Sequence, residues 1–204
     1  MSWTIENNDI SDVLLNGLKP SHPCTGGWSG TLTWQYNFFH DADVLSMLVQ
    51  TTQSATVRFN IFAALTTNGG VDPDTSNDWS ITHNTFYLVQ RGVWFYPVNT
   101  TGTTVRDNIF FAPVGGFGWY SVAQAIADIA IGNYDLFHST GSYTLASLVG
   151  GTYTLAQLQA NGKELNGLTG DPLFVSGSPT VAADFKLQAG SPARNVASEG
   201  SGNA

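Results

Sequence analysis

Two arginines and a histidine recur at matching places in the chain and could together handle an acidic ligand. Arg58 lies in ATVRFNIFA (55–63) and Arg106 in TTVRDNIFF (103–111), while His83 lies between them in SITHNTF. A guanidinium is a planar fork that suits carboxylates, and histidine is a frequent general acid or base near neutral pH. We therefore take Arg58, His83 and Arg106 as the candidate catalytic residues. The competing interpretation is that both arginines are ordinary solvated residues on the outside of strands.

Aromatic rings and a second histidine supply candidate substrate-binding residues. Tyr36 and His40 lie in YNFFHD, where His40 and Asp41 could form an acid/base pair. Trp94 and Trp119 lie in the ring-rich segments GVWFYP and FGWY. Exposed rings stack on sugar faces, but alternation along a strand leaves at most half of them outward. We expect Tyr36, His40, Trp94 and Trp119 to contact substrate; the alternative is that the rings fill the core and His40 is incidental.

A run of acidic residues could hold a hard cation. DPDTSND places Asp72, Asp74, Ser76 and Asp78 at alternate positions, and oxygen atoms are the ligands that Ca²⁺ prefers. The glycine and glutamate of a calcium-binding EF-hand loop are replaced by Asn77 and His83. Calcium is therefore a candidate cofactor with Asp72, Asp74 and Asp78 as its ligands, and a solvated acidic loop is the alternative.

Composition narrows the class of protein. Of 204 residues only 11% are charged, against about 25% in typical globular proteins, and the net charge is −8. This charge argues against a nucleic-acid partner, and the absence of an 18-residue apolar run argues against a membrane-spanning segment. A single cysteine, Cys24, excludes an internal disulfide. With no recognisable signal peptide in the chain, we expect an extracellular, cell-surface or particle-associated protein that is a mature piece or a fragment of something longer.

A repeat organises the chain and explains the two arginine segments. Aligned asparagines recur at spacings of 29, 23, 24, 24 and 25 residues. Fixed periods of 20 to 50 residues indicate a solenoid or a related repeat architecture. The aligned positions are Asn8, Asn37, Asn60, Asn84, Asn108 and, more weakly, Asn133.

Each repeat predicts one rung of a parallel β-helix, with strands on both sides of a bend. Val105 would point inward, Arg106 outward, and Asn108 would occupy the bend, because asparagine tolerates the left-handed backbone conformation. Stacked asparagines would also hydrogen-bond from rung to rung as a ladder. Segments rich in glycine and proline at 19–30, 66–78 and 112–118 predict loops that leave the rungs.

The C-terminal third closes the repeat. TLAQLQANG (154–162) predicts a short helix capped by Thr154 with Gln157, whereas SVAQAIADIAIG (121–132) could be helix or strand. NYDLFHSTG (133–141), YTLAQLQANGKELNGLTGDPLFV (153–175) and DFKLQAGSPARNVASEG (184–200) resemble the closing segment of right-handed parallel β-helix proteins of the pectate-lyase-like superfamily.

That resemblance implies a right-handed parallel β-helix of about five to six rungs, with one or two short helices near the C-terminus. We expect a single domain over 1–204, with rungs over about 1–140 and a closing segment over about 141–204. Members of this superfamily often carry an N-terminal cap, and an uncapped first rung here would invite self-association. The missing cap predicts that the chain is a fragment that lacks N-terminal rungs; the alternative is that another chain covers this end.

Two functions are open at this stage. The resemblance implies a carbohydrate-active protein, with lyase-type cleavage of an acidic polysaccharide as its reaction: an arginine or Ca²⁺ neutralises the uronate carboxylate and a base removes a proton. The alternative is a non-catalytic glycan-binding or structural module of a cell-surface or phage-like assembly. In both cases we expect the partner to be a polysaccharide or another glycan.

Overall fold

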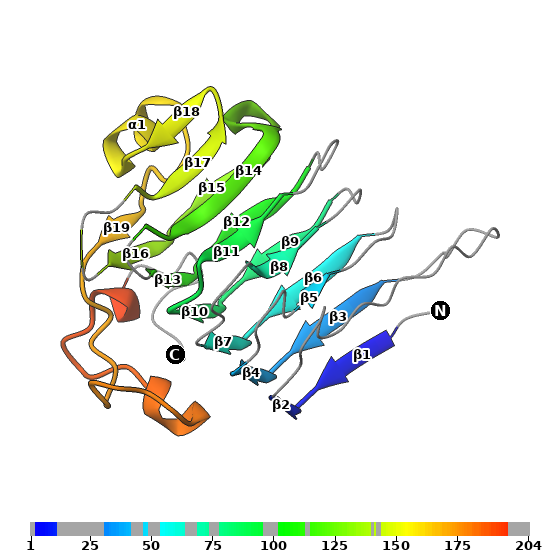
Figure 1. Ribbon diagram of the computed structural model, residues 1–204, viewed down its shortest axis with the longest axis vertical. Helices are drawn as coiled ribbons and strands as arrows, with labels where there is room; N and C mark the ends of the chain where they lie inside the picture. Colours follow the sequence, from blue (N-terminus) through cyan, green and yellow to red (C-terminus); the bar gives the residue numbers. More distant parts are fainter. Residues whose placement is uncertain are drawn as a thin grey trace.

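The chain forms a solenoid whose strands pair in parallel, apart from one antiparallel pair at its C-terminal end, which confirms the predicted all-β class (Figure 1). The strands stack from β1 (Trp3–Glu6) and β2 (Asp9–Ile10) at one end to β17 (Ala146–Val149), β18 (Gly151–Tyr153) and the helix α1 (Leu155–Ala160) at the other. The computed structural model describes residues 3–11, 31–41, 47–48, 54–63, 69–73, 78–95, 102–112, 115–139, 141 and 144–195.

Three sheets run along the solenoid, and every rung contributes strands to them. The first contains six strands, in the order β1 (Trp3–Glu6), β3 (Leu32–Gln35), β6 (Ala55–Arg58), β9 (Ser80–Thr82), β12 (Thr104–Arg106) and β15 (Ile131–Asn133). The second contains β2 (Asp9–Ile10), β4 (Phe38–His40), β7 (Ile61–Ala63), β10 (Thr85–Tyr87), β13 (Ile109–Ala112), β16 (Leu136–Ser139) and β19 (Leu168–Thr169). The third contains β5 (Met47–Leu48), β8 (Gly69–Asp72), β11 (Arg91–Trp94), β14 (Phe117–Ala125), β17 (Ala146–Val149) and β18 (Gly151–Tyr153).

The inward positions of the repeat align as predicted. Ile5 pairs in register with Trp34, Trp34 with Val57, Val57 with Ile81, and Ile81 with Val105. All but the half-buried Ile5 are fully buried. Burial of such side chains contributes roughly 1.5–3 kcal/mol each, so a matched register is strongly favoured over a slipped one.

Stacked phenylalanines fill the core where the second sheet faces the third. The rings of Phe62, Phe86 and Phe110 lie parallel, with centroids 5.0 and 4.9 Å apart. Gly92 lies opposite this stack on β11, and a Cβ atom there would come within 2.5 Å of the Phe110 ring. Gly70 stands in the same relation to Phe86, so the glycines of the third sheet make room for the rings.

The predicted asparagine ladder is present and buried. Asn60 Nδ2 donates to Asn84 Oδ1 at 3.0 Å, and Asn84 Nδ2 donates to Asn108 Oδ1 at 3.1 Å. Each amide also bonds the backbone: Asn84 Nδ2 donates to the carbonyl oxygens of Val57 and Thr82. The ladder therefore satisfies buried polar groups of two rungs at once, which is a structural role for these asparagines.

The backbone of the bend differs from the prediction in one respect. The residue with left-handed backbone is the one before each ladder asparagine, as in Tyr36, Phe59, His83 and Asp107, whose φ angles lie between 55° and 60°. Asparagine is needed at the next position because its side chain turns into the core and continues the ladder. We call the left-handed positions the bend column: Asn7, Tyr36, Phe59, His83, Asp107 and Tyr134.

The last member of the ladder was also wrongly placed. Asn133 pairs in register with Arg106, outside the ladder, and Asn108 Nδ2 donates instead to Asp135 Oδ1 at 3.1 Å. The ladder needs only an acceptor oxygen at this place, so a carboxylate serves as well as an amide. An alignment on asparagine alone therefore misses it by two residues.

The predicted connections are partly strands. Gly69–Asp72 of the 66–78 segment forms β8, and β14 begins at Phe117, inside the 112–118 segment. The ambiguous segment from residue 121 continues β14 to Ala125 and then forms the 3₁₀ turn Ile126–Asp128. The segment 19–30, with Cys24, lies outside the described residues.

The predicted C-terminal helix is confirmed as α1 (Leu155–Ala160). Thr154 caps it, and Gln157 Oε1 accepts from the Thr154 backbone at 2.8 Å to complete the capping box. Gly162 follows the helix with a φ of 73°, a left-handed conformation that glycine adopts without a steric penalty. Among the described residues, two short 3₁₀ turns follow towards the C-terminus, at Ala182–Phe185 and Pro192–Asn195.

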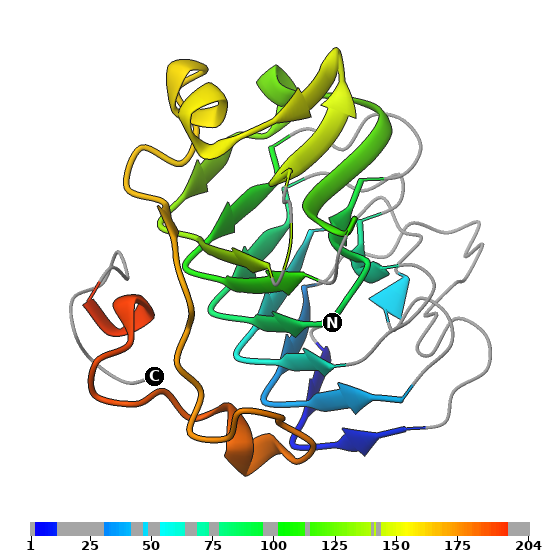
Figure 2. The same cartoon turned by 60° about the vertical axis from the view of Figure 1, so that its left-hand side comes forward.

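The C-terminal residues 171–195, which we call the strap, run back along the outside of the second sheet (Figure 2). Phe174 packs against Tyr87 and Phe111, and Phe185 packs against Phe38 and Tyr87. These rings form a second apolar cluster outside the solenoid. The strap thereby reaches from the last rungs to the first.

Candidate functional site

The two arginines among the predicted catalytic residues lie on one face of the first sheet. Arg58 pairs in register with Thr82, and Thr82 with Arg106, so the two arginines are two rungs apart, about 10 Å. We call this row the arginine column: Glu6, Gln35, Arg58, Thr82, Arg106 and Asn133. His83 follows Thr82 in the bend column, between the levels of the two arginines.

Polar contacts run along the arginine column. Gln35 Nε2 donates to Glu6 Oε2 at 2.5 Å, and Arg58 Nε donates to Gln35 Oε1 at 2.9 Å. Arg106 Nε lies 3.7 Å from Asp107 Oδ2. Both guanidinium groups are therefore engaged already, and a carboxylate ligand would have to share or replace these partners.

Three rings of the bend column stack on the surface. Tyr36 and Phe59 lie parallel with centroids 5.2 Å apart, and His83 lies 5.0 Å beyond Phe59. The Arg58 guanidinium lies 5.7 Å from the Phe59 centroid. Tyr36 is the first ring of this stack and is 52% exposed, since the preceding position of the column holds Asn7.

Tyr36 lies at a groove formed by the first two rungs and the strap. The groove has a volume of about 390 Å³, within the range of small-molecule sites. Its walls mix amide, carboxylate, hydroxyl, imidazole and apolar groups. They are Asn7, Asn8, Asp9, Tyr36, Phe38, His40, Thr180, Val181 and Ala182.

His40 is held between two carboxylates in this groove. Its Nε2 lies 2.7 Å from Asp9 Oδ1 and its Nδ1 lies 2.7 Å from Asp41 Oδ2. Burial lowers the pKa of His40, but the hydrogen bonds and charges of Asp41 and Asp9 outweigh it, and the net pKa is raised. A protonated ring donates to both carboxylates, so the three groups together carry one negative charge.

The groove wall contributed by the strap is fixed by Asp184. Its Oδ2 accepts from the backbone of Thr180 at 3.0 Å and of Val181 at 3.3 Å. These two backbone hydrogen bonds hold the pKa of Asp184 below its usual value. The turn that presents Thr180 and Val181 to the groove is thus set by a local carboxylate.

The two predicted tryptophans lie away from the groove. Trp119 is fully buried in the solenoid core, which leaves its ring unavailable to a ligand. Trp94 is half-buried on the third sheet, where the Arg91 guanidinium lies 4.6 Å from its ring centroid and 4.1 Å from that of Tyr120. Of the four expected substrate-binding residues, Tyr36 and His40 alone line the groove.

The predicted calcium ligands are only partly described. Asp72 ends β8 and is buried, whereas Asp78 is exposed and Asp74 lies outside the described residues. Within the described part of the chain, no group of three or more histidine, cysteine, aspartate or glutamate side chains could hold a metal ion. Calcium binding at this segment stays a prediction.

Asp9 is the partner of His40 that the sequence reasoning missed. Asp9 pairs in register with Phe38, and His40 lies two residues further along β4 on the same face. Because diagonal neighbours on adjacent strands are within reach of long side chains, this register could have revealed the Asp9–His40 pair. The buried acids Asp135 and Glu164 were missed too, because an aspartate replaces the asparagine that defined the repeat.

No helix among the described residues is long and apolar enough to cross a membrane. The chain has no significant match among protein-family models, curated proteins or solved structures. The site therefore has to be interpreted from its own geometry.

Proposed function

We propose that this chain is a carbohydrate-active β-helix protein of the pectate-lyase-like type, and that it binds a glycan in the groove at Tyr36 and His40. The observation that carries the proposal is an exposed aromatic ring beside convergent polar groups in a groove of suitable size. The face of a sugar is apolar and packs on such a ring, while its hydroxyls need acceptors and donors of the kind that Asn7, Asp9 and Thr180 offer.

The charge of the groove favours some glycans over others. Asp9, His40 and Asp41 sum to one negative charge when the ring is protonated, and the remaining polar wall residues are neutral amides and hydroxyls. A uronic acid in the groove would meet repulsion, whereas a neutral or amine-bearing sugar would not. This observation supports the non-catalytic glycan-binding function for the groove itself.

Lyase-type cleavage of an acidic polysaccharide remains the second candidate, and the arginine column supports it. Arg58 and Arg106 share one face about 10 Å apart, and His83 lies between their levels. An acidic chain laid along the column would place carboxylates near both guanidinium groups, with His83 as the base. Calcium, if held at Asp72, Asp74 and Asp78, would be an additional cofactor.

A glycan panel with two variants separates these functions. The panel contains neutral, amine-bearing and acidic polysaccharides, with binding and the release of unsaturated products both measured. We expect Tyr36→Ala to lose at least tenfold in binding, with Tyr134→Ala, at another bend position, as the matched control. For the lyase, Arg106→Ala abolishes product release. Groove binding is refuted if no glycan binds or if Tyr36→Ala binds as the parent does, and the lyase if no acidic glycan is cleaved.

The location and assembly of the protein are part of the same proposal. A glycan partner fits an extracellular, cell-surface or particle-associated setting. β1 and β2 form edges of the first and second sheets, and edge strands can pair with another chain. We propose self-association through this first rung. Light scattering that finds only monomer at high protein concentration contradicts it.

A further inference from the structure

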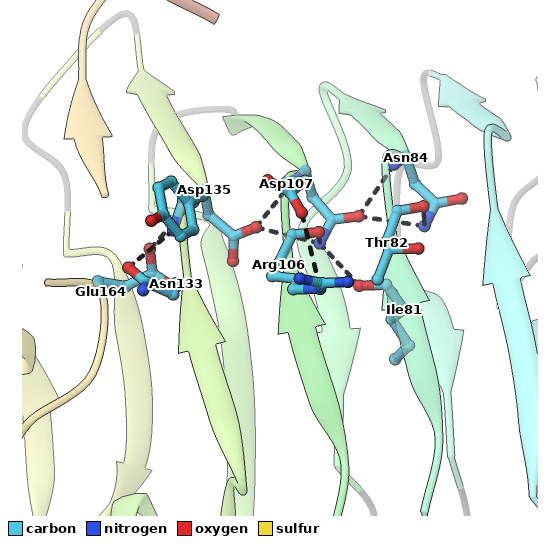
Figure 3. Close-up of polar contacts among 10 residues, drawn as sticks. Ile81, Thr82, Asn84, Arg106, Asp107, Asn133, Asp135 and Glu164 are labelled. Atoms are coloured by element: carbon cyan, nitrogen blue, oxygen red, sulfur yellow. Dashed lines mark hydrogen bonds and ion pairs between the residues drawn. The ribbon is translucent and has the colours of Figure 1, made fainter. Parts of the chain in front are cut away.

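The asparagine ladder ends on a buried carboxylate instead of another amide (Figure 3). Asp135 Oδ1 accepts from Asn108 twice, from the backbone N at 2.8 Å and from Nδ2 at 3.1 Å. Asp135 is fully buried. One of its two oxygens thus takes over the acceptor role that Oδ1 plays in Asn37, Asn60, Asn84 and Asn108.

A second buried carboxyl group occupies the next step. The Asp135 backbone N donates to Glu164 Oε2 at 3.1 Å, which continues the ladder pattern by one more residue (Figure 3). Glu164 is fully buried as well, so two carboxyl groups lie on successive buried steps of the ladder. Burying two adjacent ionised carboxylates without a cationic partner is costly, so this arrangement favours a proton on at least one of them.

The two carboxyl oxygens that accept none of these hydrogen bonds also favour a shared proton. Asp135 Oδ2 and Glu164 Oε1 are buried and have no other donor among the described residues. Two buried carboxylates in contact would also repel each other strongly, as in carboxylate dyads that share a proton. A single proton held between the two groups removes one charge and supplies the missing donor.

The charged groups nearby do not neutralise the pair. The negative charge of Asp107 raises the pKa of both acids further. Arg106 Nε lies 3.7 Å from Asp107 Oδ2. Lys163, next to Glu164 in the chain, turns its ammonium to the carbonyl oxygens of Ile129 and Ala130. Burial raises the pKa of Asp135 to about 7, and burial together with the Asp135 charge raises the pKa of Glu164 to about 11.

The chain is wrapped tightly around the Glu164 carboxyl group. The Glu164 backbone N donates to Gly132 O at 2.6 Å and its carbonyl accepts from Gly167 N at 2.9 Å. A Cβ atom on Gly167 would come within 2.4 Å of Glu164 Oε2, so only glycine fits there. Leu168 then joins β16 as the start of β19. The acid pair therefore sits where the chain after α1 attaches to the last rung.

We propose that one proton shared by Asp135 and Glu164 fastens residues 164–169 to the last rung, and that losing it in alkaline solution releases them. The direction in which stability changes with pH follows from the linkage between protonation and folding. Both acids have pKa values in the folded protein above the ordinary 3.8 and 4.5, so the stability they contribute is full below about pH 4. It declines as the pH rises through about 7 and is lost through about 11.

Infrared spectroscopy of the whole chain detects the proton directly. At pH 8 the parent protein should show the carbonyl band of a protonated carboxylic acid, and Glu164→Gln should lack it. Glu6→Gln, which removes an exposed carboxyl group of the arginine column, is the matched control and should keep the band. A parent without the band at pH 8, or a band that persists in Glu164→Gln, overturns the proposal.

Hydrogen exchange then tests the fastening. A glutamine at 164 donates from Nε2 to an ionised Asp135, and an asparagine at 135 continues the ladder to an ionised Glu164, so neither variant needs the shared proton. In the parent, exchange of the amides of residues 164–169 should rise at least tenfold between pH 7 and pH 10 beyond its intrinsic increase. Glu164→Gln and Asp135→Asn should each remove that excess. The proposal is contradicted if a folded Glu164→Gln or Asp135→Asn variant shows the same excess amide exchange as the parent.

Discussion

Asn84 and Asn108 lie 24 residues apart in sequence, yet Asn84 Nδ2 donates to Asn108 Oδ1 at 3.1 Å between neighbouring rungs. Asn84 Oδ1 in turn accepts from the backbone N and the Nδ2 of Asn60, both at 3.0 Å. One side chain thus serves buried donors and acceptors of three successive rungs. The regular spacing of asparagines along the sequence therefore reflects hydrogen bonds between neighbouring rungs.

Replacing Asn84 by alanine should destabilise the solenoid severely. The change leaves the Asn60 amide and the Val57 carbonyl oxygen without their partners in the core. Each buried group left unsatisfied costs about 1–3 kcal/mol, so we expect a loss of roughly 3 kcal/mol or more in the free energy of unfolding. Urea denaturation measures it, with the half-buried neighbour Thr85→Ala as the control. A loss no larger than that of the control would show that the ladder is dispensable.

Gly92 should tolerate no side chain. A Cβ atom there would lie 2.5 Å from the Phe110 ring and 2.8 Å from the backbone oxygen of Gly118, which cannot turn aside. Overpacking of this kind costs roughly 1–3 kcal/mol. Thermal unfolding of Gly92→Ala should report it, while Gly177→Ala, with no heavy atom within 4 Å of the added Cβ, should leave the stability nearly unchanged. Equal stability of the two variants would contradict this account.

The repeat could be predicted because stacking imposes the same demands on every rung. Val105 was identified as a core residue from alternation alone, and Val57 and Ile81 lie in register with it as the repeat requires. The ladder position of Asp135 could not be found in this way, since the period lengthens there and the residue type changes. What the position requires is an acceptor, and several residue types meet that requirement.

The groove was only half predictable, for a different reason. Tyr36 and His40 belong to the repeat, so their positions followed from its register. The opposite wall comes from Thr180 and Val181, whose place depends on Phe174 and Phe185 packing against the second sheet. The strap has no period that relates it to a particular rung, so long-range packing decides where it lies.

The stability contributed by His40 should fall as the pH rises. Its pKa is raised in the folded protein, so its pairing with Asp9 and Asp41 is fully present below about pH 6.5 and is lost as the pH rises through the raised value. Because both carboxylates are largely exposed, solvent screening limits the effect to about 1 kcal/mol. Unfolding free energies at pH 5 and pH 8 should differ by less in His40→Gln than in the parent protein. An identical difference in both would contradict the pairing.

Removing the Phe185 side chain should detach the strap while the rungs stay folded. Phe185 packs 6.0 Å from Phe38 and 5.3 Å from Tyr87, centroid to centroid, and is nearly fully buried. A buried Phe→Ala change costs roughly 3–5 kcal/mol where the structure has to keep the cavity, and a surface segment avoids that cost by leaving the sheet. Limited proteolysis of Phe185→Ala should therefore cut within residues 171–195 at least tenfold faster, with an unchanged far-ultraviolet circular dichroism spectrum. Lys186→Ala, an exposed neighbour, should be cut like the parent.

Glycan binding by Phe185→Ala should weaken in parallel, because the strap supplies Thr180 and Val181 to the groove. Unchanged proteolysis of Phe185→Ala would show that the strap is held by other contacts.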